Sequence, residues 1–115
     1  MNVNQKIERA IGTIVKQNVW PMKCPKDSPP DLYAVYNPEI EEPGYYADDA
    51  EEEWTQHMQV HIFTKANYIE LRRKIRKSLR ENEFTLTGIQ TFYEKDTGYY
   101  HLCFECYTEE EEWPM

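Results

Sequence analysis

The sequence has little of what enzymes and membrane proteins usually require. It contains only four glycines, all far apart, so no glycine-rich loop is available to hold a phosphate group. No apolar run approaches the ~18 residues of a membrane-spanning helix, and the first residues lack the apolar segment of a signal peptide. Neither Ser28 nor Ser78 lies in the glycine-flanked turn of a nucleophilic serine. We therefore expect neither an enzyme nor a membrane protein, and we expect no cofactor.

Basic residues are also in the minority. The chain has 115 residues with 13 Lys and Arg against 21 Asp and Glu, which gives a formal net charge of −8. Binding to nucleic acid needs a basic surface, so this balance argues against nucleic acid as the main partner. Aromatic residues make up 14% of the sequence, which excludes a disordered tail. The length predicts a single domain over residues 1–115.

Cysteine is scarce, and its odd count indicates free thiols: Cys24, Cys103 and Cys106. The last two form a C-x-x-C pattern within an aromatic-rich segment typical of a strand. Residues three apart on a strand point to opposite faces. The pair is therefore predicted to form neither a metal clamp nor a redox dithiol.

Two helices are predicted from apolar residues that recur at helical spacing. The first spans residues 3–18 and presents an apolar face made of Val3, Ile7, Ile11, Ile14 and Val15. The second spans residues 67–82, with a stripe made of Tyr68, Leu71, Ile75 and Leu79. Asn67 and Glu70 fit the N-cap and N3 positions of a capping box, and Glu70 can also pair with Lys74.

Four strands are predicted, over residues 32–37, 54–64, 85–94 and 99–108. Apolar and polar residues alternate along 54–64, with only Gln56 interrupting the apolar face. Gly98 closes the hairpin between the last two strands, and Gly88 marks a bulge. The order α-β-β-α-β-β predicts an α+β fold, an antiparallel sheet of about four strands with two main helices packed on it. A ferredoxin-like split βαβ arrangement is the alternative.

Three segments are expected to lie largely outside regular structure. A proline-rich connection covers residues 21–43 around the short strand, and its prolines exclude helix through most of it. Residues 39–53 contain eight acids and no base, which predicts an exposed loop. The acidic C-terminal tail at 109–115 is expected to fray.

The three histidines are His57, His61 and His101. Three imidazoles close together could bind zinc, but residues four apart on a strand lie roughly 13 Å from one another. Asp48 and Asp49 do not match a calcium-binding loop. We interpret these groups as surface residues and keep a small metal-dependent enzyme as an alternative that metal analysis would remove.

The second helix has a strongly basic outer surface made of Arg72, Arg73, Lys74, Arg76, Lys77 and Arg80. It could be a solvated surface, a binding site for phosphates, or a docking site for an acidic surface of a neighbouring subunit. The last interpretation predicts a head-to-tail homo-oligomer. Its predicted interface comprises Arg72, Arg73, Arg76, Lys77 and Arg80 on one side, and Asp48, Asp49, Glu51, Glu52 and Glu53 on the other. A nucleic-acid-binding or regulatory module using helix 72–80 remains the alternative.

Four segments together resemble a known family. They read L-Y-A-V-Y-N at 32–37, Y-A-D-D at 46–49, M-Q-V-H-I-F-T-K-A-N-Y at 58–68 and Y-E-K-D-T-G-Y-Y-H at 93–101. A strand ending in Y-N, an acidic A-D-D loop, a strand-to-helix step, a basic helix and this hairpin resemble the tail-completion or tail-terminator proteins of long-tailed phages and prophages of Gram-positive bacteria. The resemblance covers about residues 32–108.

The resemblance implies a structural role in virion assembly. Members of that family form hexameric rings at the head-proximal end of the tail tube, where they stop tube growth and meet the head-tail connector. DNA passes through the ring without specific binding, and an acidic wall would let it slide by repulsion. The expected partners are further copies of the chain, the tail tube protein and the connector, with no membrane. The expected location is the host cytoplasm during assembly and then the virion tail.

Overall fold

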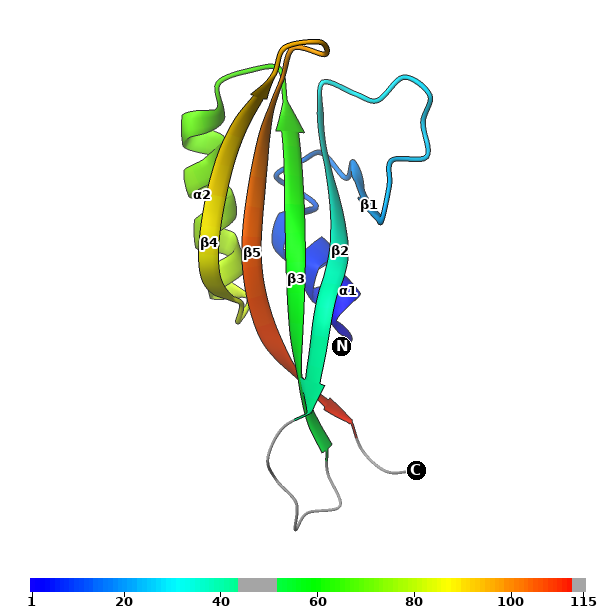
Figure 1. Cartoon of the computed structure of the whole chain (residues 1–115), viewed down its shortest axis with the longest axis vertical. Coiled ribbons are helices and arrows are strands. Elements are labelled where there is room, and N and C mark those ends of the chain that lie inside the picture. Colours follow the sequence, from blue (N-terminus) through cyan, green and yellow to red (C-terminus); the bar gives the residue numbers. More distant parts are fainter. Residues whose placement is uncertain (44–51, 113–115) are drawn as a thin grey trace.

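The computed structural model describes residues 1–43 and 52–112, and for residues 52, 53, 111 and 112 it describes the backbone alone. Figure 1 shows a tall sheet with both helices on the same face. The elements in chain order are α1 (Val3–Ile11), β1 (Val19–Pro21), β2 (Leu32–Pro43), β3 (Glu52–Thr64), α2 (Tyr68–Glu81), β4 (Thr85–Glu94) and β5 (Tyr99–Glu112). The helices therefore leave the other face of the sheet uncovered.

The sheet has five strands in the order β1-β2-β3-β5-β4. All neighbours are antiparallel except β1 and β2, which are parallel. The predicted α+β class and the largely antiparallel sheet are confirmed, but the predicted strand number and element order are wrong. The additional strand is β1. It has only three residues and ends at the first proline of the sequence, so no strand pattern predicts it. Because β5 lies between β3 and β4, the β3-α2-β4 segment is a split βαβ unit, one part of the alternative arrangement.

Helix α1 is shorter than predicted. It begins with a capping box between Asn2 and Gln5 and ends at Ile11 rather than near residue 18. Lys16 and Gln17 adopt left-handed backbone angles, with φ of 57° and 65°, which a continuing helix does not allow. The resulting turn still buries Val15 completely, so that residue contributes to the core from outside the helix.

Strand β2 continues through Pro38 to Pro43, although proline was expected to end it at residue 37. Strand β1 pairs with β2 only as far as Tyr36, so the prolines lie where the outer edge of β2 has no partner. A missing N–H is tolerated on such an edge. The register with β3 shifts between Pro38 and Ile40, which accommodates the irregularity.

The central strands are also longer than predicted. β3 begins at Glu52, and β5 continues to Glu112, so residues 109–112 pair with β3 instead of fraying. The two ends of the predicted acidic loop, 39–43 and 52–53, are likewise parts of β2 and β3. Strands β2, β3 and β5 extend past both helices at the lower end of the molecule (Figure 1). The whole molecule measures 52 × 25 × 22 Å.

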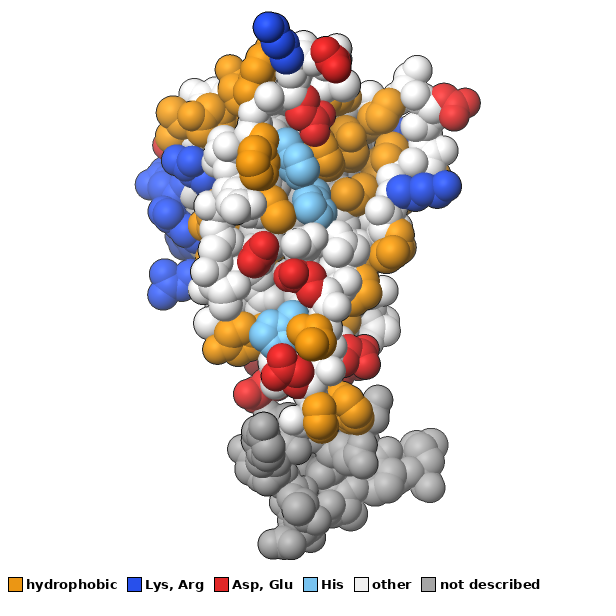
Figure 2. Space-filling view, in the orientation of Figure 1, with side chains coloured by type: hydrophobic (Ala, Val, Ile, Leu, Met, Phe, Trp, Pro, Cys, Tyr) orange, Lys and Arg blue, Asp and Glu red, His pale blue; other side chains and the backbone are white. Residues whose placement is uncertain are grey.

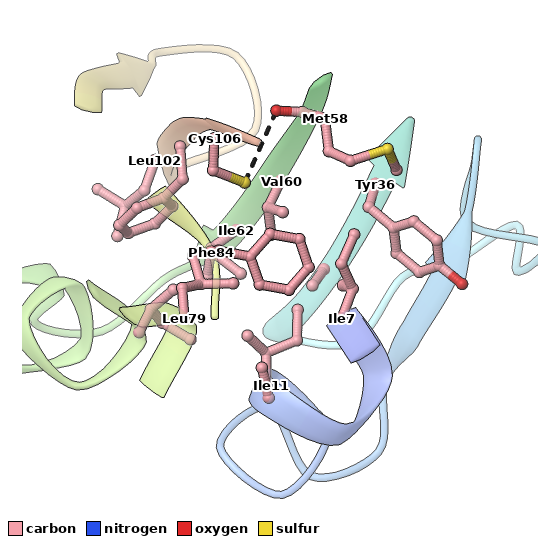
Figure 3. Close-up of a cluster of buried hydrophobic side chains, with 14 of the residues drawn as sticks. Ile7, Ile11, Tyr36, Met58, Val60, Ile62, Leu79, Phe84, Leu102 and Cys106 are labelled. Carbon is pink, nitrogen blue, oxygen red and sulfur yellow. Dashed lines mark hydrogen bonds between the residues drawn. The ribbon is translucent and has the colours of Figure 1, made fainter. Parts of the chain in front are cut away.

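The core lies between the sheet and the helices (Figure 3). Met58, Val60 and Ile62 are fully buried, which confirms the predicted apolar face of β3. Besides Val15, the remaining fully buried apolar residues come from α1, α2, β2 and β5, and the largest are Ile7, Ile11, Ile75, Leu79, Tyr36, Leu102 and Phe104. Gln56 lies on the same face, as predicted, and is buried at 6% exposure. The packing of two helical stripes on one sheet face therefore supplies the hydrophobic stabilisation.

Two tests on α2 check this packing. Ile75→Ala removes a side chain that is fully buried against the sheet and leaves a cavity, so we expect the free energy of unfolding to fall by about 2–5 kcal/mol. Ile69→Ala on the same helix is the matched control, because Ile69 is 55% exposed, and it should change stability by less than about 0.5 kcal/mol. Urea unfolding measures both; equal losses would contradict the described burial.

Candidate interaction surfaces

Helix α2 is oriented by its cap and its apolar stripe. The Asn67 side-chain oxygen accepts a hydrogen bond from the Ile69 N–H at 2.9 Å, which confirms the predicted N-cap, but the reciprocal bond of the predicted capping box is absent from the described residues. Glu70 forms an ion pair with Arg73 at 2.9 Å, and not with Lys74 as expected. Because Ile75 and Leu79 face the core, the basic side of the helix faces outward.

Five of the six basic residues of α2 are exposed: Arg73, Lys74, Arg76, Lys77 and Arg80. Arg72 differs, since it is half-buried and its guanidinium donates a hydrogen bond to the Thr91 hydroxyl of β4 at 3.2 Å. It also lies 5.4 Å from the centre of the Tyr68 ring. Arg72 therefore links α2 to β4, and the other five residues form the outward basic surface, called here the basic face.

The basic face has little counter-charge within the chain. Across the described residues, the ion pair of Arg73 with Glu70 is the only one recorded for α2. An open hollow of about 640 Å³ lies among Arg73, Lys74, Arg76, Lys77, Arg80 and Glu81. A second, of about 660 Å³, lies between α2 and β4 and is lined by Arg76, Arg80 and residues 84–89. The cations are thus available to a partner.

The opposite sign gathers at the lower end of the sheet. The described acids there are Glu39, Glu41, Glu42, Glu109 and Glu110, here called the acidic end. Residues 37–43, 54–57 and 106–110 contain no Lys or Arg, although the Lys6 ammonium of α1 donates a hydrogen bond to the Thr108 hydroxyl at 2.6 Å. Of the predicted acidic interface, Asp48, Asp49 and Glu51 lie outside the described residues, and Glu52 and Glu53 are described only as β3 backbone. In Figure 2 a group of blue cations lies along the left margin and several red carboxylates lie on the lower part of the uncovered face, while further charges of both signs lie near the top and the right margin.

The uncovered face of the sheet carries a row of rings near its upper end. Tyr33 stacks on Phe63 with ring centres 4.7 Å apart, and Phe63 stacks on His101 at 4.3 Å. These residues lie opposite one another in the registers of β2, β3 and β5. Tyr99 contacts the same cluster edge-on, and its hydroxyl donates to the Pro30 carbonyl at 2.9 Å. The row thereby anchors the proline-rich connection to the sheet.

Two histidines join this row. His61 Nδ1 lies 2.8 Å from His101 Nε2, and His61 Nε2 lies 3.1 Å from the Asn37 side-chain oxygen. Burial lowers the pKa of both histidines; the pKa of His61 is lowered further by His101, while Glu94 partly opposes the shift in His101. The sequence placed these residues on the surface, whereas the structure holds them half-buried and hydrogen-bonded. His57 stands apart from the pair, 3.5 Å from the Glu42 carboxylate.

The cysteines lie as the strand pattern predicted. Cys106 faces the core, where its thiol donates to the Met58 carbonyl at 3.8 Å (Figure 3). Cys103 pairs with His61 in the register of β3 and β5. Because Val60 and Ile62 face the core, His61 between them faces the uncovered side, and Cys103 lies on that side too. Burial raises the pKa of Cys106 to about 12 and also raises the pKa of Cys103. Burial thus disfavours the thiolate at both positions, and the thiolate is the form that binds metal and attacks as a nucleophile.

In the part of the chain that the structure describes, no three His, Cys, Asp or Glu residues are arranged to hold a metal ion. The same residues include no helix long and apolar enough to cross a bilayer. Sequence reasoning placed five of the six basic residues of α2 outward, but Arg72 of the predicted interface is turned toward β4. It considered the histidines as possible neighbours, but only the register between β3 and β5 shows that His61 and His101 are in contact and His57 is not. The position of β4 at the end of the sheet was not predicted, because it depends on the strand order.

No family model and no curated protein matches the chain. Among solved structures, the chain is similar to a chain of the "Virion of native gene transfer agent (GTA) particle", with a TM-score of 0.45 and 12% sequence identity. That match covers 94% of this chain and 92% of the other.

The histidine pair predicts a pH dependence of stability. Because the folded-state pKa of each histidine is below its ordinary value of 6.5, the unfolded chain binds more protons once the pH falls below that value. Stability should therefore decrease as the pH falls through about 6.5 and level off below the folded-state pKa values. Thermal unfolding between pH 7.5 and 5.5 should show a falling Tm in the native chain and a flatter profile in His61→Gln/His101→Gln. His57→Gln is the matched control, and equal slopes in all three proteins would contradict the assignment.

Proposed function

We propose that this chain is a structural protein of a phage or phage-like virion, a tail terminator or head-tail joining component that forms a ring at the head-proximal end of the tail tube. The sequence pattern over residues 32–108 supports the proposal. Three of its four segments fall on β2, on β3 with the start of α2, and on the β4–β5 hairpin, and the fourth, at 46–49, lies outside the described residues. In this role the chain has no catalytic task and needs no cofactor.

The segregation of charge on one folded unit is the observation that carries the ring proposal. The basic face lies on α2, and the acidic end lies where β2, β3 and β5 extend beyond the helices. Two basic faces repel each other, and so do two acidic ends, which disfavours a two-fold dimer through either surface. Where each subunit makes this contact with a different neighbour on each side, the contact is heterologous, and it closes into a ring when the rotation between subunits permits. Complementary charge would also guide the subunits into register.

The net charge of −8 suits the passage of DNA. In a ring whose basic faces are covered by neighbouring acidic ends, the remaining surface is acidic and repels the phosphate backbone. DNA would then pass through without being held. The tail tube protein and the head-tail connector are the expected partners on the two sides of the ring. Assembly would take place in the host cytoplasm, and the protein would then remain in the virion tail.

Native mass spectrometry over a range of concentrations and salt tests the ring. We expect hexamer-sized particles at low and moderate salt. The variant Arg73→Glu/Arg76→Glu/Arg80→Glu should shift the population to monomers by about tenfold or more, because about 1.4 kcal/mol of lost contact energy suffices for that factor. Circular dichroism should show an unchanged fold, since all three side chains are exposed.

The matched control is Lys16→Glu/Lys23→Glu/Lys95→Glu, which changes the net charge equally at exposed sites outside α2. It should assemble like the native chain. Equal assembly of the α2 variant and the native chain would contradict a charge-mediated contact. A native monomer at every concentration would contradict a self-closing ring.

The exposed cations of α2 also support a second candidate function, that of a nucleic-acid-binding or regulatory module. Binding of a fluorescent DNA duplex separates the two functions. We expect no binding at physiological salt, since the chain is acidic overall. Strong binding that falls steeply with salt, and that the α2 charge-reversal variant abolishes, would favour the second candidate instead.

A further inference from the structure

We propose that the free edge of β4 is a binding site for an extended acidic segment of a partner protein, which would add a strand to the sheet beside α2. β4 is the last strand in the order β1-β2-β3-β5-β4, so one of its edges has no partner strand in the described chain. Figure 1 shows β4 at the margin of the sheet. The site belongs to the free subunit, because in the proposed ring Arg76 and Arg80 would face the acidic end of a neighbour instead.

Edge strands usually carry features that prevent pairing with other chains, such as proline, lysine or very short length. The opposite edge has them: β1 is three residues long and ends at Pro21, and the outer edge of β2 carries Pro38 and Pro43. β4 is ten residues long and contains no proline, lysine or arginine, and its one acid is Glu94 at its end. Its edge is therefore open to strand addition.

The geometry of β4 also suits an added strand. Its register with β5 shifts once, between Leu86 and Gly88, and then runs without a break to Glu94. Phe92 and Tyr93 are 48% and 58% exposed, on opposite faces of the sheet, so an incoming chain would find an aromatic side chain on each side. Residues of this type favour pairing across strands.

The basic residues beside β4 specify the chemistry of the partner. Arg76 and Arg80 line the hollow of about 660 Å³ between α2 and residues 84–89. Neither forms an ion pair among the described residues. In a strand added to β4, every second side chain would lie on the helix-covered face, beside these guanidinium groups. Carboxylates at alternate positions would meet that charge, while main-chain hydrogen bonds would hold the strand.

A second copy of β4 fits this edge less well. An antiparallel β4–β4 pair would place two copies of α2 next to each other on the same face of one continuous sheet. Each copy brings five exposed cations, so the two helices would repel. The charge beside the edge therefore favours an acidic partner over self-pairing.

Fluorescent peptides of ten residues, matching the length of β4, test the site on the full chain. One peptide alternates glutamate with valine, a second alternates lysine with valine, and a third is the acidic peptide with alternate amides N-methylated. We expect the acidic peptide to bind at least about tenfold more tightly than the lysine peptide, and N-methylation to abolish binding because the strand loses its donors. Hydrogen exchange should show new protection in residues 88–94.

Matched variants separate the site from general electrostatics. Arg76→Glu/Arg80→Glu should weaken acidic-peptide binding at least about tenfold, and Lys16→Glu/Lys23→Glu should leave it unchanged. Equal binding of the N-methylated peptide would overturn strand addition, and absence of acidic-peptide binding would overturn the site. Protection of β4 that rises with protein concentration without peptide would identify a second copy as the occupant and overturn the proposal. Peptide bound to the monomer in native mass spectra supports the site whether or not a ring forms.

Discussion

The central strand β3 is the constraint on which the rest of the structure depends. It pairs with β2 on one side and β5 on the other along almost its whole length. Met58, Val60 and Ile62 enter the core on one face, and His61 and Phe63 alternate with them on the other. A shift of one residue in its register would exchange these two sets of side chains. The position of both helices, the row of aromatic side chains on the uncovered face and the histidine pair all depend on this one register.

Covering one face of the sheet produces two distinct surfaces for interaction. Helix α2 buries Ile75 and Leu79, and that burial forces the arginines on its other side outward. Arg72 instead donates a hydrogen bond to Thr91 of β4. This bond holds α2, and with it the basic face, next to the free edge of β4. The acidic end is built from strands that continue where no helix covers them (Figure 1). Packing and charge are therefore parts of the same arrangement, since the cations and the carboxylates are held on one framework.

Local signals in the sequence predicted the parts of the fold that depend on neighbouring residues. The alternation along β3, the Asn67 cap, the Gly98 turn and the bulge near Gly88 are all confirmed. The parts that depend on distant partners were missed. Pro38 and Pro43 look like strand breakers unless β1 is known to stop at Tyr36, and Glu109–Glu110 look like a frayed tail unless β3 is known to lie beside them. The three histidines were considered as possible neighbours, but the contact between His61 and His101, which are 40 residues apart, is fixed only by the register of β3 with β5.

Because β2, β3 and β5 extend beyond the helices, the molecule has two layers in its upper part, sheet and helices, and only the sheet in its lower part (Figure 1). In the upper part, opening a strand exposes core residues such as Val60 and Phe104, so it costs a large share of the global free energy of unfolding. In the lower part, only ladder hydrogen bonds and neighbouring side chains oppose opening. The cost of opening therefore changes along each strand, from high beside the helices to low at the acidic end. The acidic end is thus the part of the sheet that a contact with another molecule would stabilise most.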